Sequence, residues 1–272
     1  MPRISSSAGG RALEIMDVSL QTANDVKNIG INSALDTLSK KANSILSFIY
    51  GYVLTYDESF DTDDEILNWT IVDVVDDLSA AIWNLGTGFY KTSASCQRGS
   101  LEMASVSLYF QRLENESPIQ GGYNEAFSKW DGGISSTPNW GTTKPRLQNS
   151  LLVKKFKDEN DFCVIEEAHS HFKYLCSFTH SRAFSPEDGE GTNSMNMLNQ
   201  AGEYNQKEFE RIVKALDATI ANIASIWAVT YPHTVSEWTD DGVGMEFVSL
   251  DELFCTPKAK KALAFARSHT IT

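Results

Sequence analysis

The chain has 272 residues, of which 42% are hydrophobic, enough for a buried core in one large domain or two small ones. Its formal net charge of -13 disfavours nonspecific binding to nucleic acid or to an anionic membrane, because the overall field repels phosphate. No run approaches eighteen uncharged apolar residues, so the sequence predicts no transmembrane helix and no membrane partner.

The N-terminus and the cysteines bear on cellular location. Residues 1–10 have no apolar stretch typical of a secretory signal, and we expect them to form a disordered leader before a single domain over residues 11–272. The four cysteines are widely spaced and contain no CxxC pair. Reduced thiols in the cytoplasm are the simplest account of this spacing, so we expect a cytoplasmic protein.

Apolar residues at helical spacing predict helices along the first half of the chain. Residues 11–53 are expected to form two helical pieces that meet near Gly30. A helix then begins at Thr62 or Asp63 and ends at the glycines 86–88. The next helix, at 90–114, has apolar residues on two sides, which is typical of a central helix. The apolar stripe of the first piece consists of Leu13, Met16, Leu20 and Ala23.

Glycine and proline interrupt the pattern between residues 114 and 144, which predicts a long loop carrying one short helix at 124–130. Expected after this loop, in chain order, are helices at 146–157 and 160–181, a polar loop at 184–202, a helix at 203–230 that Pro232 ends, a short β piece at 244–250 and a final helix at 257–268. Strands and helices do not alternate, so we predict an all-α helical bundle.

Residues 166–182 hold three of the five histidines. On a helix that turns by 100° per residue, His169, Lys173 and His180 share one face beside an apolar stripe. His171 points about 160° away from His169, so these two side chains cannot bind one metal on a regular helix. This pattern suits a helix that borders a polar cleft.

Other kinds of chemistry find less support in the sequence. Glu166-x-x-His169 resembles half of a di-iron site, but no second ExxH occurs, so we predict no metal and no cofactor. Phosphate-binding and serine-nucleophile motifs are also missing from the sequence. Cys176 lies one turn from Lys173 and His180, which would favour a thiolate, but a small packing cysteine is the favoured interpretation.

The remaining interpretation is metal-independent cleavage of RNA, in which the ribose supplies the 2′-hydroxyl nucleophile. His180 would act as general base or acid, and Lys173, Arg182 and Arg98 would stabilise the phosphate, with His169 beside them. The alternative role of His180 is structural, because a histidine at a helix end often caps carbonyl groups and complements the helix dipole.

These residues resemble a known family. Lys173, six further residues and then His180 near a helix end are similar to the motif of the HEPN superfamily, in which an arginine precedes a histidine by four to six residues. The motif 98–102, Arg-Gly-Ser-Leu-Glu, is similar to the start of an earlier bundle helix in that superfamily. The resemblance covers about residues 90–230, roughly half of the chain.

This resemblance implies a helical bundle, frequent homodimers, and RNA cleavage without metal in the active members, with roles in toxin–antitoxin systems or antiviral defence. Many members of the superfamily are inactive binding or scaffold versions. Two hypotheses follow: a ribonuclease of prokaryotic defence or stress response, and a non-catalytic helical module that pairs with itself or with a protein partner.

Overall fold

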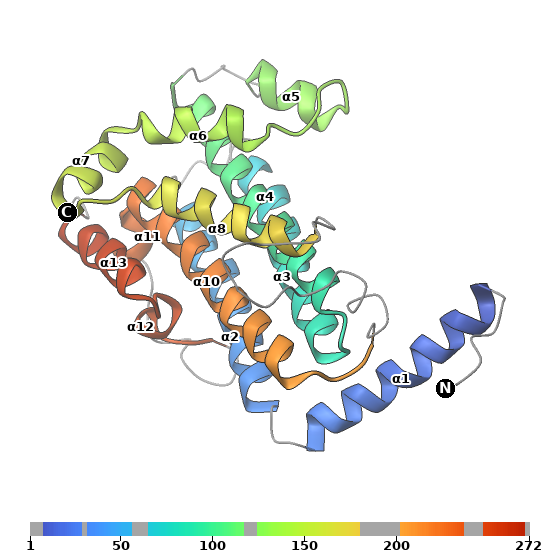
Figure 1. Cartoon of the computed structure of the whole chain (residues 1–272). Coiled ribbons are helices and arrows are strands. Elements are labelled where there is room, and N and C mark those ends of the chain that lie inside the picture. Colours follow the sequence, from blue (N-terminus) through green and yellow to red (C-terminus); the bar gives the residue numbers. More distant parts are fainter. Residues whose placement is uncertain are drawn as a thin grey trace.

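The computed structural model describes residues 8–28, 32–55, 65–116, 124–179, 202–236 and 247–269, and these residues form helices and short connections with no strand among them. The predicted all-α bundle is therefore confirmed (Figure 1). The helices are α1 (Ala8–Asn28), α2 (Asn32–Thr55), α3 (Glu65–Gly86), α4 (Tyr90–Glu116), α5 (Glu125–Asp131), α6 (Trp140–Gln148), α7 (Leu151–Asn160), α8 (Val164–Thr179), α10 (Gln206–Thr230), α11 (His233–Ser236), α12 (Leu250–Leu253) and α13 (Pro257–His269).

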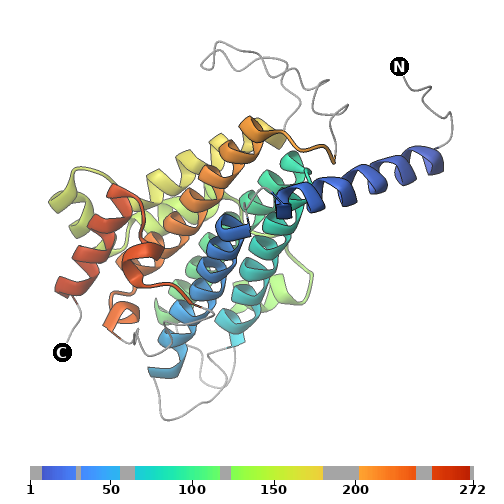
Figure 2. The ribbon, with the colours of Figure 1, turned by 90° about the horizontal axis from the view of Figure 1, so that it is seen from below.

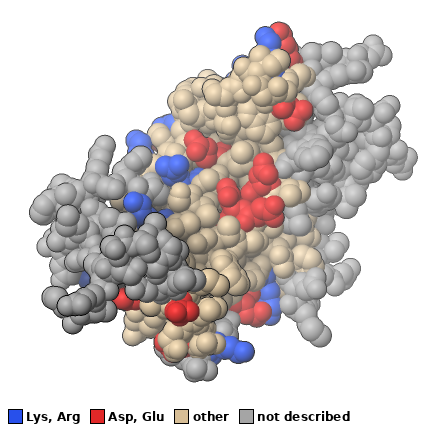
Figure 3. All heavy atoms as spheres, turned by 90° about the vertical axis from the view of Figure 1, so that its right-hand side faces the viewer, with Lys and Arg blue, Asp and Glu red and all other residues tan. Residues whose placement is uncertain are grey.

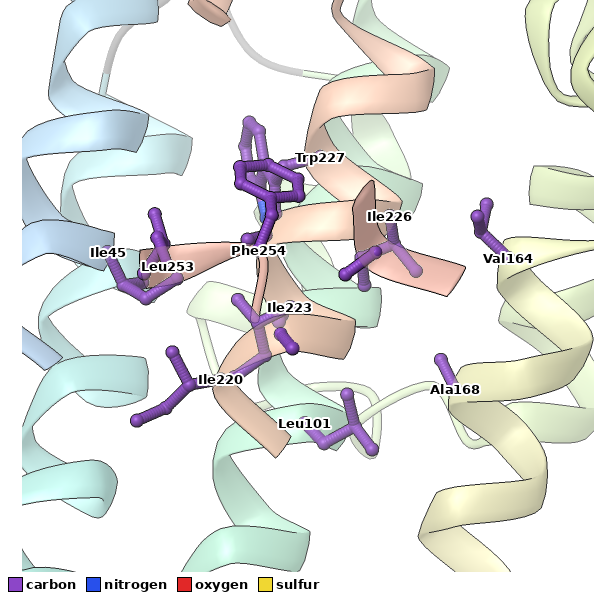
Figure 4. Packing of buried hydrophobic residues seen from close by; sticks show 14 of the residues in the cluster. Ile45, Leu101, Val164, Ala168, Ile220, Ile223, Ile226, Trp227, Leu253 and Phe254 are labelled. Carbon is purple, nitrogen blue, oxygen red and sulfur yellow. The ribbon is translucent and has the colours of Figure 1, made fainter. Parts of the chain in front are cut away.

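The core is built around α10, which packs against α2, α4, α8 and α13. Its residues Ile220, Ile223 and Trp227 are fully buried and lie among side chains from the surrounding helices (Figure 4). The second half of α10, from Ala218 to Thr230, has no charged residue, and a helical segment that is apolar on nearly all sides is stable only in such a position. By length and composition α10 is able to cross a membrane, and 72% of its apolar window is buried inside the bundle.

The helices α3 and α4 form a close antiparallel pair in which serines of α4 face α3. Ser93, Ser100 and Ser107 are seven residues apart, so they lie on one side of α4, and all three are fully buried. Ser93 donates to the carbonyl oxygen of Ala81 at 2.7 Å, and Ser100 donates to that of Val74 at 2.9 Å. Small side chains with satisfied hydroxyls allow the two backbones to approach closely.

Several predicted boundaries need correction. The loop was expected to continue to residue 144, but helix α6 already begins at Trp140. The Asn139 side chain caps this helix by accepting a hydrogen bond from the amide of Gly141. The helix expected at 146–157 is two helices, α6 and α7, separated at Asn149. The helix expected from residue 160 begins at Val164, because Asp161 has a left-handed backbone conformation, with a φ of 60°, and ends α7.

The predicted β piece at 244–250 is wrong for the residues that the structure describes. Residues 247–249 have no regular structure, and Leu250 begins α12 behind a capping box formed by Ser249 and Glu252. Residues 244–246, the loop expected at 184–202 except Gly202, and most of the expected leader lie outside the described residues.

The first helix differs most from the expectation for a core element. Helix α1 projects from the bundle in two views at right angles (Figures 1 and 2). Met16 is 60% exposed and Leu20 is 57% exposed, although both belong to the predicted apolar stripe. The side of α1 that faces the bundle instead buries Ser19, Thr22 and Val26. Thr22 donates to the carbonyl oxygen of Gly202 at 2.6 Å, which joins α1 to the start of the α10 segment.

Candidate functional site on helix α8

Helix α8 separates its two described histidines, as the sequence predicts. His169 faces α6, where its ring stacks on that of Trp140 with 5.3 Å between centroids and 23° between planes. His171 faces α10, where its Nε2 lies 3.1 Å from the carbonyl oxygen of Ala215. The two sides of α8 therefore present two distinct chemical environments.

The surroundings of His169 disfavour its protonated form. Partial burial lowers the pKa of His169, and the ammonium groups of Lys144 and Lys173 lower it further. Lys144 Nζ lies 3.5 Å from His169 Nδ1, and because an ammonium group only donates, a hydrogen bond between them requires Nδ1 to accept. The sequence did not predict Lys144 and Trp140 as site residues. The one signal that could have placed them on a helix is Asn139, a residue type that favours helix N-caps.

Arg98 approaches the same side of α8 from α4. Its guanidinium carbon lies 5.9 Å from the ring centroid of Phe172, and the centroid of His169 lies 6.4 Å from that of the same ring. Glu102, one turn along α4, has a pKa raised by burial and partly offset by the charge of Arg98. We call the group of Arg98, His169, Phe172 and Lys173 the α4/α8 face.

Three of the five predicted site residues therefore gather on one face, and two cannot be placed. Arg98, His169 and Lys173 belong to the α4/α8 face. His180 and Arg182 lie outside the described residues, directly after Thr179, the last residue of α8. Their contacts with the α4/α8 face remain predictions.

The charge of the neighbouring surface is strongly uneven. On the side that lies to the right in Figure 1, carboxylates gather in the middle of the surface and Lys and Arg side chains lie toward its periphery (Figure 3). Helix α3 carries Asp73, Asp76 and Asp77, and burial together with repulsion among these carboxylates raises the pKa of Asp73 and Asp77. A phosphate would be repelled by this acidic surface and attracted by the cationic groups of the α4/α8 face.

His171 belongs to a buried network that the sequence did not indicate. Its Nε2–H donates to the carbonyl oxygen of Ala215 and lies 2.9 Å from Thr219 Oγ1. Gln97 of α4 continues the network at 3.5 Å from Thr219. Burial lowers the pKa of His171 to about 4, so the ring is neutral at physiological pH and helps to join α8, α10 and α4.

A pocket of about 490 Å³ lies beside this network, between α8, α10 and the first turn of α13. Its titratable lining groups are Glu167, His171 and Lys258. Lys258 Nζ and a Glu167 carboxylate oxygen form an ion pair at 2.6 Å. We call this the α8/α10/α13 pocket.

Within the described ranges, no group of three or more His, Cys, Asp or Glu side chains is arranged to hold a metal ion. The four cysteines are free, and burial raises the pKa of Cys96 and Cys255, which disfavours a reactive thiolate at those two positions. The chain matches no family model, no curated protein and no solved structure.

Proposed function

We propose that this protein is a HEPN-like ribonuclease of prokaryotic defence or stress response that cleaves RNA without a metal ion, at the α4/α8 face. The observation that carries the proposal is that Arg98 of α4 and His169 of α8 both lie beside Phe172, and that Lys173 is close enough to His169 to lower its pKa. In the sequence, His169, Phe172 and Lys173 precede His180 by seven to eleven residues.

The chemistry of this face suits a phosphodiester. Arg98 and Lys173 supply positive charge for a phosphate, and Phe172 with His169 supplies aromatic surface against which a base can stack. Stacking accepts any base, which fits an enzyme that acts on unpaired RNA. The acidic α3 surface would repel RNA phosphates, so that the RNA contacts the protein at the α4/α8 face and not on α3.

The proposed reaction is an internal transfer. His180 removes the proton of a ribose 2′-hydroxyl, and the oxygen attacks the adjacent phosphorus. The bond from phosphorus to the 5′-oxygen then breaks, and the 5′-oxygen leaves with a proton from solvent. The products are a 2′,3′-cyclic phosphate and a 5′-hydroxyl. Lys173, Arg98 and Arg182 stabilise the charge that develops on the phosphate oxygens.

Incubation of the protein with tRNA and total RNA in excess EDTA tests this proposal. We expect cleavage with 2′,3′-cyclic phosphate ends. His180→Ala should lower the rate by a factor of about 10² to 10⁴, the usual contribution of a general acid or base. Lys173→Ala should lower it as well, whereas Lys173→Arg should retain or increase it, because guanidinium binds phosphate with two hydrogen bonds.

The matched control is Lys154→Ala, which removes an exposed lysine from α7, outside the α4/α8 face. It should leave the rate of cleavage unchanged. If the wild type releases no cyclic phosphate ends, or if His180→Ala cleaves as fast as the wild type, the proposed function is wrong.

One observation favours a second candidate, a non-catalytic module that pairs with a second copy of itself. The stripe of α1 has spacings of three, four and three residues, which is the pattern of a coiled-coil seam, and its members Met16 and Leu20 are exposed on a projecting helix. Two copies of such a seam are complementary to each other about a two-fold axis. Light scattering that finds only monomer at micromolar concentration would exclude this candidate.

A further inference from the structure

The α8/α10/α13 pocket lies on the side of α8 away from the α4/α8 face, and RNA cleavage as proposed does not use it. Its walls are largely apolar, with Val164 of α8, Ala218 and Ala221 of α10 and Phe162 before α8. A volume of about 490 Å³ is within the range of pockets that hold small organic molecules. The chemistry of its polar groups indicates which molecules fit.

Several polar groups of the lining that α8 and α10 contribute are left as hydrogen-bond acceptors. Ser170 and Ser225 each donate their only hydroxyl hydrogen to a helix carbonyl four residues earlier, at 2.8 Å and 2.6 Å. Asn222 donates one amide hydrogen to the carbonyl oxygen of Ala218 at 2.8 Å, so its Oδ1 is identified as an acceptor atom. His171 is neutral, with its one N–H directed at Ala215. What remains for a ligand is therefore a mixture: oxygen lone pairs and the carboxylate of Glu167 accept hydrogen bonds, and the Thr256 hydroxyl and the second amide hydrogen of Asn222 donate them.

The contacts of Lys258 show how an ammonium group binds at the edge of this pocket. Its Nζ contacts Glu167 at 2.6 Å and lies 5.6 Å from the ring centroid of Phe162, so a carboxylate and an aromatic face receive the same cation. The Lys258 side chain is 52% exposed, and an ion pair this exposed contributes little to stability. Another ammonium group would therefore displace Lys258 into solvent at small cost.

We propose that the α8/α10/α13 pocket binds a small primary amine, whose ammonium group replaces that of Lys258 on Glu167 and Phe162 while its carbon skeleton lies against the apolar walls. The donor-rich cation satisfies the acceptor groups of the lining, and the net charge of -13 favours the approach of a cation.

Titration calorimetry with benzylamine as the probe tests this proposal, with benzyl alcohol as its neutral counterpart. Benzylamine should bind about twofold to fivefold more tightly than benzyl alcohol, because only the amine brings a charged donor to Glu167 and so exposed a contact is worth at most about 1 kcal/mol. Glu167→Gln should weaken benzylamine binding by a similar factor. Lys258→Ala should strengthen it by about twofold to fivefold, the equivalent of a surface ion pair that no longer competes.

The strengthening in Lys258→Ala distinguishes a binding site from a residue that only supports the fold, since loss of support would weaken binding. The matched control is Glu210→Gln, an exposed carboxylate of α10 outside the pocket, which should bind benzylamine like the wild type. Equal affinity for benzylamine and benzyl alcohol, no heat of binding with either, or weaker binding by Lys258→Ala would each overturn the proposal.

Discussion

At the scale of single residues, His171 couples the stability of the fold to pH. Burial lowers its pKa from 6.5 to about 4 in the folded protein. Between these pH values His171 binds a proton in the unfolded chain but not in the folded protein. The free energy of unfolding therefore falls as the pH falls. The contribution of His171 is fully present above pH 6.5 and should decline by about 3 kcal/mol on acidification to about pH 4.

The comparison variant is His171→Gln, whose amide can donate to the same carbonyl of Ala215 but does not titrate. Urea unfolding of both proteins should give a difference in stability that shrinks steadily from pH 7 to pH 4, because only the wild type loses the contribution of the histidine. Parallel stability curves over this range would contradict the assignment of a buried neutral histidine.

At the scale of helices, the spacing of α3 and α4 depends on small side chains. Ser100 is fully buried and donates to the carbonyl of Val74. Ser100→Ala should lower the free energy of unfolding by about 1 kcal/mol, the value of one hydrogen bond. Ser100→Leu should lower it by about 3 kcal/mol, because the larger side chain forces the helices apart. Urea unfolding measures both changes.

Ser79→Leu provides the control for this pair, since Ser79 lies on the exposed side of α3 and its replacement should change stability by less than about 0.5 kcal/mol. If Ser100→Leu were tolerated as well as Ser79→Leu, the close approach of the two helices would not depend on the serines.

At the scale of the whole molecule, the projecting α1 determines how two copies could meet. The exposed Met16 and Leu20 would form the centre of a seam between two α1 helices. Leu20→Glu should convert a dimer to a monomer, because it places a charge in that seam, and light scattering measures the mass. Val72→Glu, an equally drastic change on the exposed side of α3, should leave the mass unchanged.

The sequence by itself determined the fold class, most helix positions and the separation of His169 from His171. These depend on local rules, namely apolar residues at helical spacing, Pro232 and Pro257 at helix ends, and a rotation of 100° per residue. The gathering of Arg98 with α8 was also predicted, whereas His180 and Arg182 lie outside the described residues and stay predictions.

Only the tertiary structure decided which apolar stripe is buried. The stripes of α1 and α10 both follow helical spacing, yet α10 is enclosed by the surrounding helices whereas Met16 and Leu20 of α1 are exposed. Spacing identifies a face of a helix but not its neighbour. For the same reason the α8/α10/α13 pocket could not be predicted, because Glu167 and Lys258 are 91 residues apart and meet only when α13 packs against α10.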